Sequence, residues 1–186
     1  MAIQIAQEPD ADQVLTADRF ALLVGMLLDQ QFPMERAFAG PAKILQRFGT
    51  LDPDAIAAAD PDRFAELCSR PPAIHRFPAS MAARVQAVAG EIVQTYGGQV
   101  ERLWEEAGSG QELLKRVSGL PGFGRQKSQI FVALLGKQLG VEPPGWREAA
   151  GGYGEPGVFK SVADVIDPDS LAKVRAYKKE QKARAH

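Results

Sequence analysis

The feature that most constrains the fold is the spacing of the apolar residues, which recur every three or four positions along almost the whole chain. In the stretch 19–31, one helical face is formed by Phe20, Leu23, Val24, Leu27 and Leu28. No stretch of β-branched residues alternates with polar residues in the manner of a strand. The pattern therefore predicts an all-α protein.

The same spacing locates the expected helices, and glycine, proline and capping residues mark their ends. Asp52-Pro53 and Asp60-Pro61 each look like an N-cap followed by proline at the first helical position. The predicted helices cover residues 19–31, 41–48, 54–59, 62–67, 81–96, 111–117 and 125–139, with short pieces at 103–104 and 146–150 and a last helix that begins at 169 or 170.

The composition argues against membrane-spanning, secreted and iron–sulfur proteins. With 186 residues, 45% of them hydrophobic, the chain is long enough for one or two domains with a buried core. It has no apolar run long enough to predict a membrane span, and its N-terminus lacks the pattern of a signal peptide. Cys68 is the single cysteine, which argues against a disulfide and against an iron–sulfur cluster. We therefore expect a monomeric protein of the reducing cytoplasm.

The charge is unevenly distributed along the chain. The formal net charge is only −1, but residues 67–186 hold seventeen basic residues against twelve acidic ones. The C-terminal stretch 171–186 contains six of those basic residues and a single acid, Glu180. Such a segment could reach DNA phosphates, because each bound cation releases condensed counterions. A solvated end of a helix explains the same pattern equally well.

The stretch 118–128 contains the most specific motif, Leu120-Pro121-Gly122-Phe123-Gly124, between two amphipathic helices. Glycines permit backbone angles closed to other residues and let a ligand approach the main chain. Pro121 stiffens the turn, and Leu120 and Phe123 are expected to pin it to the core.

The helix that follows this motif begins with unpaired N–H groups at its positive dipole end, which suit an anion. Arg125 and Lys127 lie on the same first turn. The motif therefore predicts a site for a DNA phosphate that does not read base sequence. The alternative is an ordinary tight turn between two helices, with glycines present for steric reasons alone.

With this motif the chain resembles the helix-hairpin-helix (HhH-GPD) superfamily of base-excision DNA glycosylases, whose hairpin reads Leu-Pro-Gly-Val/Ile-Gly. Residues 22–31 and 76–97 are similar to helices that precede the hairpin in that superfamily. The resemblance implies a two-lobed helical bundle that holds double-stranded DNA in its cleft, associated with the nucleoid. It implies a core lobe over residues 18–140, with the helix-hairpin-helix at 111–139, and a smaller lobe formed by 1–17 and 141–186.

The resemblance also assigns roles within the hairpin. The amides of Gly122, Gly124 and Lys127 would hold a phosphate, and the neighbouring hairpin residues from Leu120 to Lys127, including Pro121, Phe123, Arg125 and Gln126, would contact DNA. A monovalent cation, K⁺ or Na⁺, would bind the carbonyl oxygens of Ser118, Leu120 and Phe123. No other cofactor is expected.

The catalytic residues of the superfamily do not all have a counterpart. A nucleophilic lysine of the bifunctional members stands where this chain has Gln126, and Lys127 is rotated by about 100° on a helix, which predicts that it points away from the cleft. A lyase reaction is therefore not expected. The stretch 141–146, which matches the position of the superfamily's aspartate, contains none. Glu142 and Glu148 are the nearest carboxylates to steady a sugar cation, and each is equally well explained as a loop charge.

Four further residues are candidates for contacts with an extruded base. Gln30 and Gln31 follow a buried helix, where a polar side chain could fill the gap that the base leaves. Trp146, in a glycine-rich loop, is expected to line a base pocket. His75 could contact phosphate or act as an acid, although a hydrogen-bonded loop histidine is the simpler interpretation.

The sequence thus predicts a DNA-binding base-excision repair protein, a monofunctional DNA N-glycosylase that removes a damaged or mispaired base. The alternative is an inactive module of the same fold that binds damaged or distorted DNA. A helical protein-interaction domain without DNA is a third hypothesis, which the hairpin argues against.

Overall fold

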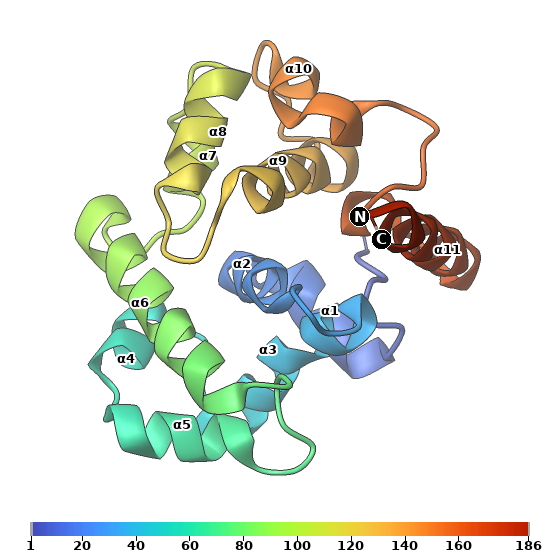
Figure 1. The fold of residues 1–186 in the computed structure, drawn as a ribbon. Coiled ribbons are helices and arrows are strands. Elements are labelled where there is room, and N and C mark those ends of the chain that lie inside the picture. Colours follow the sequence, from blue (N-terminus) through green and yellow to red (C-terminus); the bar gives the residue numbers. More distant parts are fainter. Residues whose placement is uncertain (1, 186) are drawn as a thin grey trace.

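The computed structural model describes residues 2–185, and within that range the secondary structure is helical, without strands, as the sequence predicts (Figure 1). The α-helices are α1 (Pro9–Ala17), α2 (Arg19–Leu28), α3 (Met34–Phe48), α4 (Pro53–Ala58), α5 (Pro61–Ser69), α6 (Pro78–Tyr96), α7 (Arg102–Glu105), α8 (Gly110–Ser118), α9 (Arg125–Leu139), α10 (Trp146–Ala150) and α11 (Pro168–Ala185). Two short 3₁₀ turns, η1 (Gly151–Gly154) and η2 (Val162–Asp164), lie between α10 and α11.

Local chemistry accounts for many of the helix ends. Asp18 caps α2 by accepting a hydrogen bond from the amide of Ala21 at 3.0 Å. Asp52 and Asp60 cap α4 and α5 in the same way, each followed by proline at the first helical position. These Asp-Pro pairs therefore work as the sequence predicts.

Two differences from the predicted helices have physical reasons. α1 was not expected because its buried apolar side is small, with Ala11 and Leu15 as its only fully buried residues. α3 begins at Met34 instead of residue 41 and continues through Pro41, which is buried inside it. A proline in a helix interior removes one hydrogen bond, and here the burial of one side of α3 against α2 outweighs that loss.

α2 is the centre of the molecule, since nine of its ten residues are buried. Around it, α3 packs against α2, while α6 packs against α4 and α5. On the other side, α9 is surrounded by α8, α10 and the two 3₁₀ turns (Figure 1). The loop between α8 and α9 and the end of α2 therefore lie close together, although their helices belong to different sides of the core.

The segments that flank residues 18–140 pack on different helices. α1 lies against α2 and α3, whereas α10 and η2 lie against α9. The division into a core lobe and a smaller lobe made of both terminal segments stays a prediction. None of the helices within residues 2–185 is long and apolar enough to cross a membrane.

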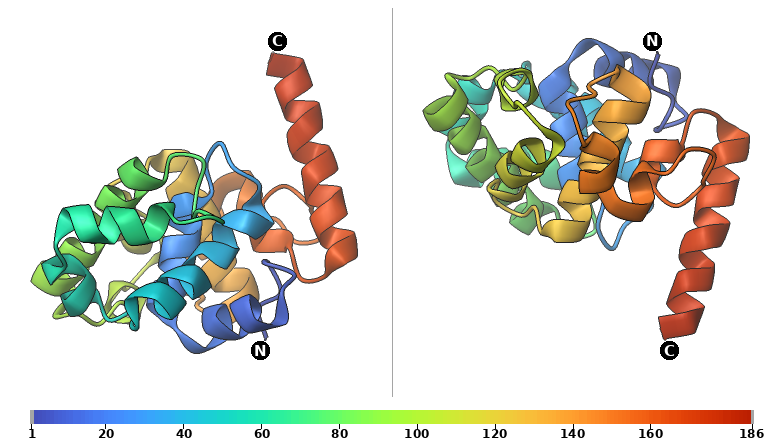
Figure 2. Two further views of the ribbon diagram at one scale, coloured as in Figure 1. Left: turned by 90° about the horizontal axis from the view of Figure 1, so that it is seen from below. Right: turned by 90° about the horizontal axis from the view of Figure 1, so that it is seen from above.

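The last helix stands apart from the rest of the structure. Only the first part of α11 is packed, through Ser170, Leu171 and Val174, and its contacts are mainly with η2. Figure 2 shows the C-terminal part of α11 extending well past the body of the protein.

Candidate functional site

The hairpin between α8 and α9 is anchored by its two apolar residues. Leu120 is 3% exposed and Phe123 is 4% exposed, as the sequence predicts for residues that pin the turn. The amide of Phe123 donates a hydrogen bond to the carbonyl oxygen of Leu120 at 3.1 Å. The ring of Phe123 also meets Phe131 of α9 edge to face, so the hairpin is rigidly attached to α9.

The two hairpin glycines are required for different reasons. Gly122 has φ +82°, and a Cβ added there would lie 2.8 Å from Leu27 Cδ1 of α2, so only glycine fits without strain. Gly124 has φ −76°, which any residue adopts, so the expectation of a special backbone angle is wrong at this position. A Cβ at Gly124 would meet nothing within 4 Å. Its main chain is therefore open to an incoming ligand.

The amides that follow the hairpin are free to bind an anion. Within residues 2–185, no hydrogen bond is formed by the backbone N–H of Gly122, Gly124, Arg125, Gln126 or Lys127. The first amide of α9 with an internal partner is that of Ser128, which donates to the carbonyl oxygen of Gly124 at 3.0 Å. Free amides at the positive end of a fifteen-residue helix favour a bound anion.

A pocket of about 490 Å³ opens next to these amides, between the end of α2, the start of α9 and α11. Its charged and polar lining includes Asp29, Gln30, Gln126, Lys127, Tyr153, Lys178 and Lys182. We call it the cleft pocket. It joins residues that lie as much as about 150 positions apart in the sequence, and Gln126 and Lys127, two of the residues with free amides, line it.

Lys127 points into the cleft pocket, so the expectation that helix rotation turns it away is wrong. Its Nζ donates to the carbonyl oxygen of Leu27 and to Oε1 of Gln30, both at 2.7 Å. Gln126 lines the same pocket and donates to the hydroxyl of Tyr153 at 2.8 Å. The pocket is wide enough to take side chains from two successive helical positions.

The position of Lys127 also changes its acidity. Burial lowers the pKa of the Lys127 ammonium to about 8, with the charge of Asp29 acting in the opposite direction. At neutral pH a fraction of this lysine is therefore an uncharged amine. An ammonium at the C-terminal end of α2 also stabilises that helix, because the last carbonyl groups lack partners.

Asp29 is the carboxylate of the cleft pocket, and no motif in the sequence marks it. Its side chain is 6% exposed, and Oδ2 lies 3.7 Å from Nζ of Lys178 in α11. Burial raises the pKa of the Asp29 carboxyl, while the positive charges of Lys178 and Lys127 oppose that rise. A buried carboxylate between two lysines from different helices has no local sequence signature, since residue 29 simply follows α2.

His75 supports the loop after α2 and lies behind the cleft pocket. Nδ1 of His75 accepts from the amide of Phe77 at 3.0 Å, so Nε2 carries the proton that is donated to the carbonyl oxygen of Gln30 at 2.8 Å. Burial lowers the pKa of His75, which keeps the ring neutral. His75 is buried and does not line the pocket, so the structure gives it the role of a hydrogen-bonded loop histidine.

The two glutamines after α2 have different environments. Gln30 is held between His75 and Lys127 through its carbonyl oxygen and its side chain. Gln31 is exposed and has φ +52°, a conformation that L side chains rarely adopt. Strained residues of this kind cluster at binding sites, and Gln31 lines the rim of the cleft pocket.

The carboxylates expected to be catalytic lie elsewhere. Glu142 is exposed and lines a separate hollow with Arg19 and Glu101, and Glu148 is exposed on α10. Asp164, a further carboxylate after α9, is paired with Lys137 at 2.6 Å and belongs to the capping box of η2. Neither Glu142 nor Glu148 lines the cleft pocket, and Glu142 follows the C-terminal end of α9, whereas the pocket is lined by the start of that helix.

Trp146 is a core residue and not part of the pocket. It is 7% exposed, and its ring lies so close to α9 that a Cβ on Gly136 would be 2.3 Å from it. The glycine-rich loop thus turns its tryptophan inward because Gly136 leaves room for the ring.

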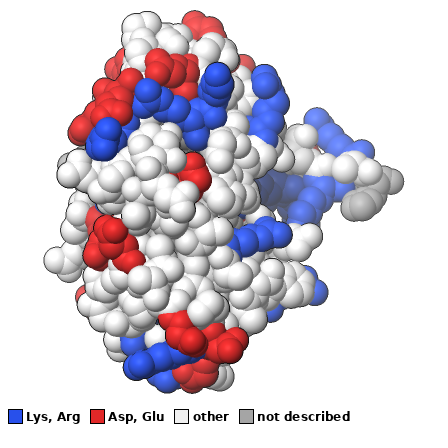
Figure 3. Space-filling model, turned by 90° about the vertical axis from the view of Figure 1, so that its left-hand side faces the viewer, with Lys and Arg blue, Asp and Glu red and all other residues white. Residues whose placement is uncertain are grey.

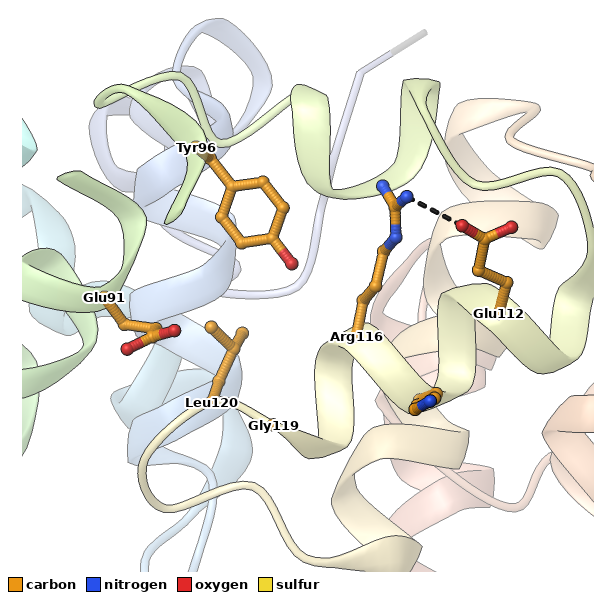
Figure 4. Close-up of a pocket in the computed structure, with 7 residues that line it drawn as sticks. Glu91, Tyr96, Glu112, Arg116, Gly119 and Leu120 are labelled. Carbon is orange, nitrogen blue, oxygen red and sulfur yellow. Dashed lines mark hydrogen bonds and ion pairs between the residues drawn. The ribbon is translucent and has the colours of Figure 1, made fainter. Parts of the chain in front are cut away.

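The other side of the hairpin has a smaller pocket of about 320 Å³, shown in Figure 4. Arg116 in that pocket is held by Glu112 at 2.7 Å, and Glu91 and Tyr96 face the same space. The carbonyl oxygen of Leu120 already accepts the amide of Phe123. The cation on the carbonyls of Ser118, Leu120 and Phe123 stays a prediction.

Charge differs between the two halves of the face that α6 and α8 form. In Figure 3 the acidic side chains gather along the left margin and at the lower end of this face. In the right-hand half, from which α11 projects, most of the surface is uncharged and the charged side chains are mainly basic. The lining of the cleft pocket is itself mainly basic, with four lysines against Asp29, and such a lining favours a polyanion.

A helical protein with free amides at a rigid hairpin and a basic cleft beside it has the features of the helix-hairpin-helix class of DNA-binding proteins. The chain belongs to the HhH-GPD superfamily of base excision DNA repair proteins, whose family model matches residues 24–184. No curated protein and no solved structure matches the chain. The resemblance carried by the hairpin is thus confirmed.

Proposed function

We propose that this protein is a DNA N-glycosylase that receives a damaged or mispaired nucleotide in the cleft pocket. The observation that carries the proposal is the buried Asp29 carboxylate in a pocket that is also lined by Gln126 and Lys127, whose backbone amides are free. In this arrangement the hairpin holds a phosphate while the pocket takes the base and sugar extruded from the duplex.

Asp29 has the chemistry that cleavage of an N-glycosidic bond needs. As that bond breaks, positive charge develops on the sugar, and the electron pair of the bond leaves with the base. A carboxylate close to the sugar stabilises that charge, and water then adds to the sugar carbon. Lys178 pairs with the Asp29 carboxylate, and the positive charges of Lys178 and Lys127 favour its ionised form.

The test is base release from duplexes that each carry one lesion or mismatch, followed by alkaline cleavage at the abasic product. We expect product from at least one substrate, and we expect Asp29→Asn to slow its formation by about 100- to 1000-fold. Glu148→Gln is the matched control, because it also neutralises a carboxylate but lies outside the pocket. Tight binding to distorted duplex with no product from a broad panel would establish the inactive module instead.

A second activity, cleavage of the strand at an abasic site, is favoured by the position of Lys127. Its uncharged amine would attack the aldehyde carbon of the open sugar, and loss of water would give an iminium ion. Removal of a proton from the adjacent carbon then expels the 3′ phosphate, and water releases the amine. The lowered pKa of Lys127, about 8, makes the neutral amine accessible near physiological pH.

Borohydride reduction tests this second activity, because it fixes the iminium ion as a covalent protein–DNA adduct. We expect the adduct with DNA that carries an abasic site, and none with Lys127→Gln. Lys43→Gln is a suitable control, since Lys43 is another partly buried lysine whose pKa burial lowers, outside the cleft pocket. An unchanged adduct yield with Lys127→Gln would assign the reaction to another amine.

A further inference from the structure

One face of α11 is apolar near the start of the helix and basic further along. Leu171 and Val174 are buried where the helix packs on the body. Continued by steps of three or four residues, the same face carries Lys178 and Lys182, both of which line the cleft pocket. The stripe that anchors α11 thus becomes basic at the point where the helix leaves the core.

The charge of α11 exceeds what the protein itself neutralises. The helix carries six basic residues against Asp169 and Glu180, a surplus of four. Lys173 and Arg184 pair with those two acids, and Arg175 and Lys178 pair with Glu35 and Asp29 of the body. Within residues 2–185, Lys182 forms no ion pair and makes no hydrogen bond through its side chain.

This basic stripe borders the same space as the hairpin. Gln126 and Lys127 line the cleft pocket from the start of α9, and Lys178 and Lys182 line it from α11. Figure 3 shows basic side chains of α11 standing out beyond the body, and Figure 2 shows that no other element covers this half of the helix. A duplex bound to the hairpin amides would run past it.

We propose that Lys178 and Lys182 bind the phosphate backbone of the duplex across the cleft pocket from the hairpin, so that α11 is a second wall of the DNA-binding groove. The proposal rests on the proposed function, because it takes duplex DNA as the occupant. Charge complementarity supports that occupant, since duplex DNA carries a regular array of phosphates that a straight row of lysines can follow. The anchoring contacts of Leu171 and Val174 fix the direction of that row.

The salt dependence of binding measures such contacts. The plot of log Kd against log salt concentration changes slope by about 0.9 for each phosphate contact that is lost. The experiment uses the full chain and a labelled duplex with a stable abasic-site analogue, titrated between low and moderate KCl. Lys182→Gln is compared with Lys173→Gln, which removes the same charge nine residues away, about half a turn round the helix.

We expect Lys182→Gln to reduce the slope by about one unit and to weaken binding several-fold at low salt. Lys173→Gln, whose lysine pairs with Asp169, should leave the slope unchanged. Equal effects of the two variants, or no effect of Lys182→Gln on a protein that binds the duplex, would overturn the proposal and leave the glycosylase assignment intact. Failure of the unaltered protein to bind any duplex would remove the proposed function as well. Unchanged thermal unfolding of both variants confirms that the fold is retained.

Discussion

The hairpin and the cleft pocket lie side by side but are built in opposite ways. The hairpin acts through backbone amides within a few consecutive residues, and its two apolar side chains are buried. The pocket presents charged side chains from three parts of the chain, Asp29 just after α2, Lys127 of α9 and Lys178 of α11. The first arrangement suits binding of any DNA backbone, and the second suits chemistry on one nucleotide. Affinity and catalysis should therefore be separable by mutation.

The sharpest test of this separation is a comparison of Asp29→Asn with Gly124→Ala. Loss of one preorganised charge from a catalytic site costs about 100- to 1000-fold in rate. We expect Asp29→Asn to reduce single-turnover base release by that factor while Kd for duplex DNA changes little. Gly124→Ala should weaken binding about tenfold, because it obstructs a charge-assisted hydrogen bond to phosphate. A parallel loss of rate and affinity in both variants would mean that the two regions act as one.

Within the hairpin, the two glycines give the next largest contrast. Gly122→Ala should lower the free energy of unfolding by about 1–2 kcal/mol or more, because its φ of +82° is unfavourable for a side chain and Leu27 is in the way. Gly124→Ala should have a much smaller effect on unfolding, since a Cβ there meets no atom. Chemical denaturation of both variants measures the difference. Equal destabilisation would show that a side chain at position 124 does meet other atoms in the folded protein.

These contrasts explain which parts of the site can be predicted from the sequence. The hairpin is predictable because its signal is local, with glycine, proline and two apolar residues within one turn. The sequence does not predict the buried position of Trp146, because its environment depends on Gly136, which leaves room for the ring on a different helix. It does not mark Asp29, because the importance of this residue depends on the lysines that α9 and α11 bring to it. It points to residues such as Glu142 because they match a position along the chain, whereas catalysis depends on proximity in space.

The pH dependence of adduct formation tests whether Lys127 is the nucleophile. Because the pKa of Lys127 is about 8, the uncharged fraction rises about tenfold per pH unit below that value and then levels off. We expect the rate of borohydride trapping to follow the same curve. A plateau only above pH 10 would indicate a solvent-exposed lysine as the nucleophile.

The same pKa has a consequence for stability. Between the lowered value of about 8 and the ordinary lysine value of 10.5, the unfolded chain binds this proton more tightly than the folded protein. The contribution of Lys127 to stability therefore increases with pH in that window. Lys127→Gln should remove this part of the pH dependence in denaturation experiments, since glutamine does not titrate.

The smallest expected effect concerns Gln126, which stands where the bifunctional members of the superfamily have their lysine. Its side-chain amide donates to the hydroxyl of Tyr153 in an exposed part of the cleft pocket. Such a hydrogen bond contributes about 1 kcal/mol at most. Gln126→Ala should change Kd and the rate of base release by less than about threefold, within what one such bond can supply. Gln126→Lys would place an amine beside Lys127 without the hydrogen bonds to Leu27 and Gln30 that orient the native one. If Gln126→Lys restored adduct formation to a Lys127→Gln background, the pocket would accept a nucleophile from either helical position, and the orienting contacts of Lys127 would be dispensable for the chemistry.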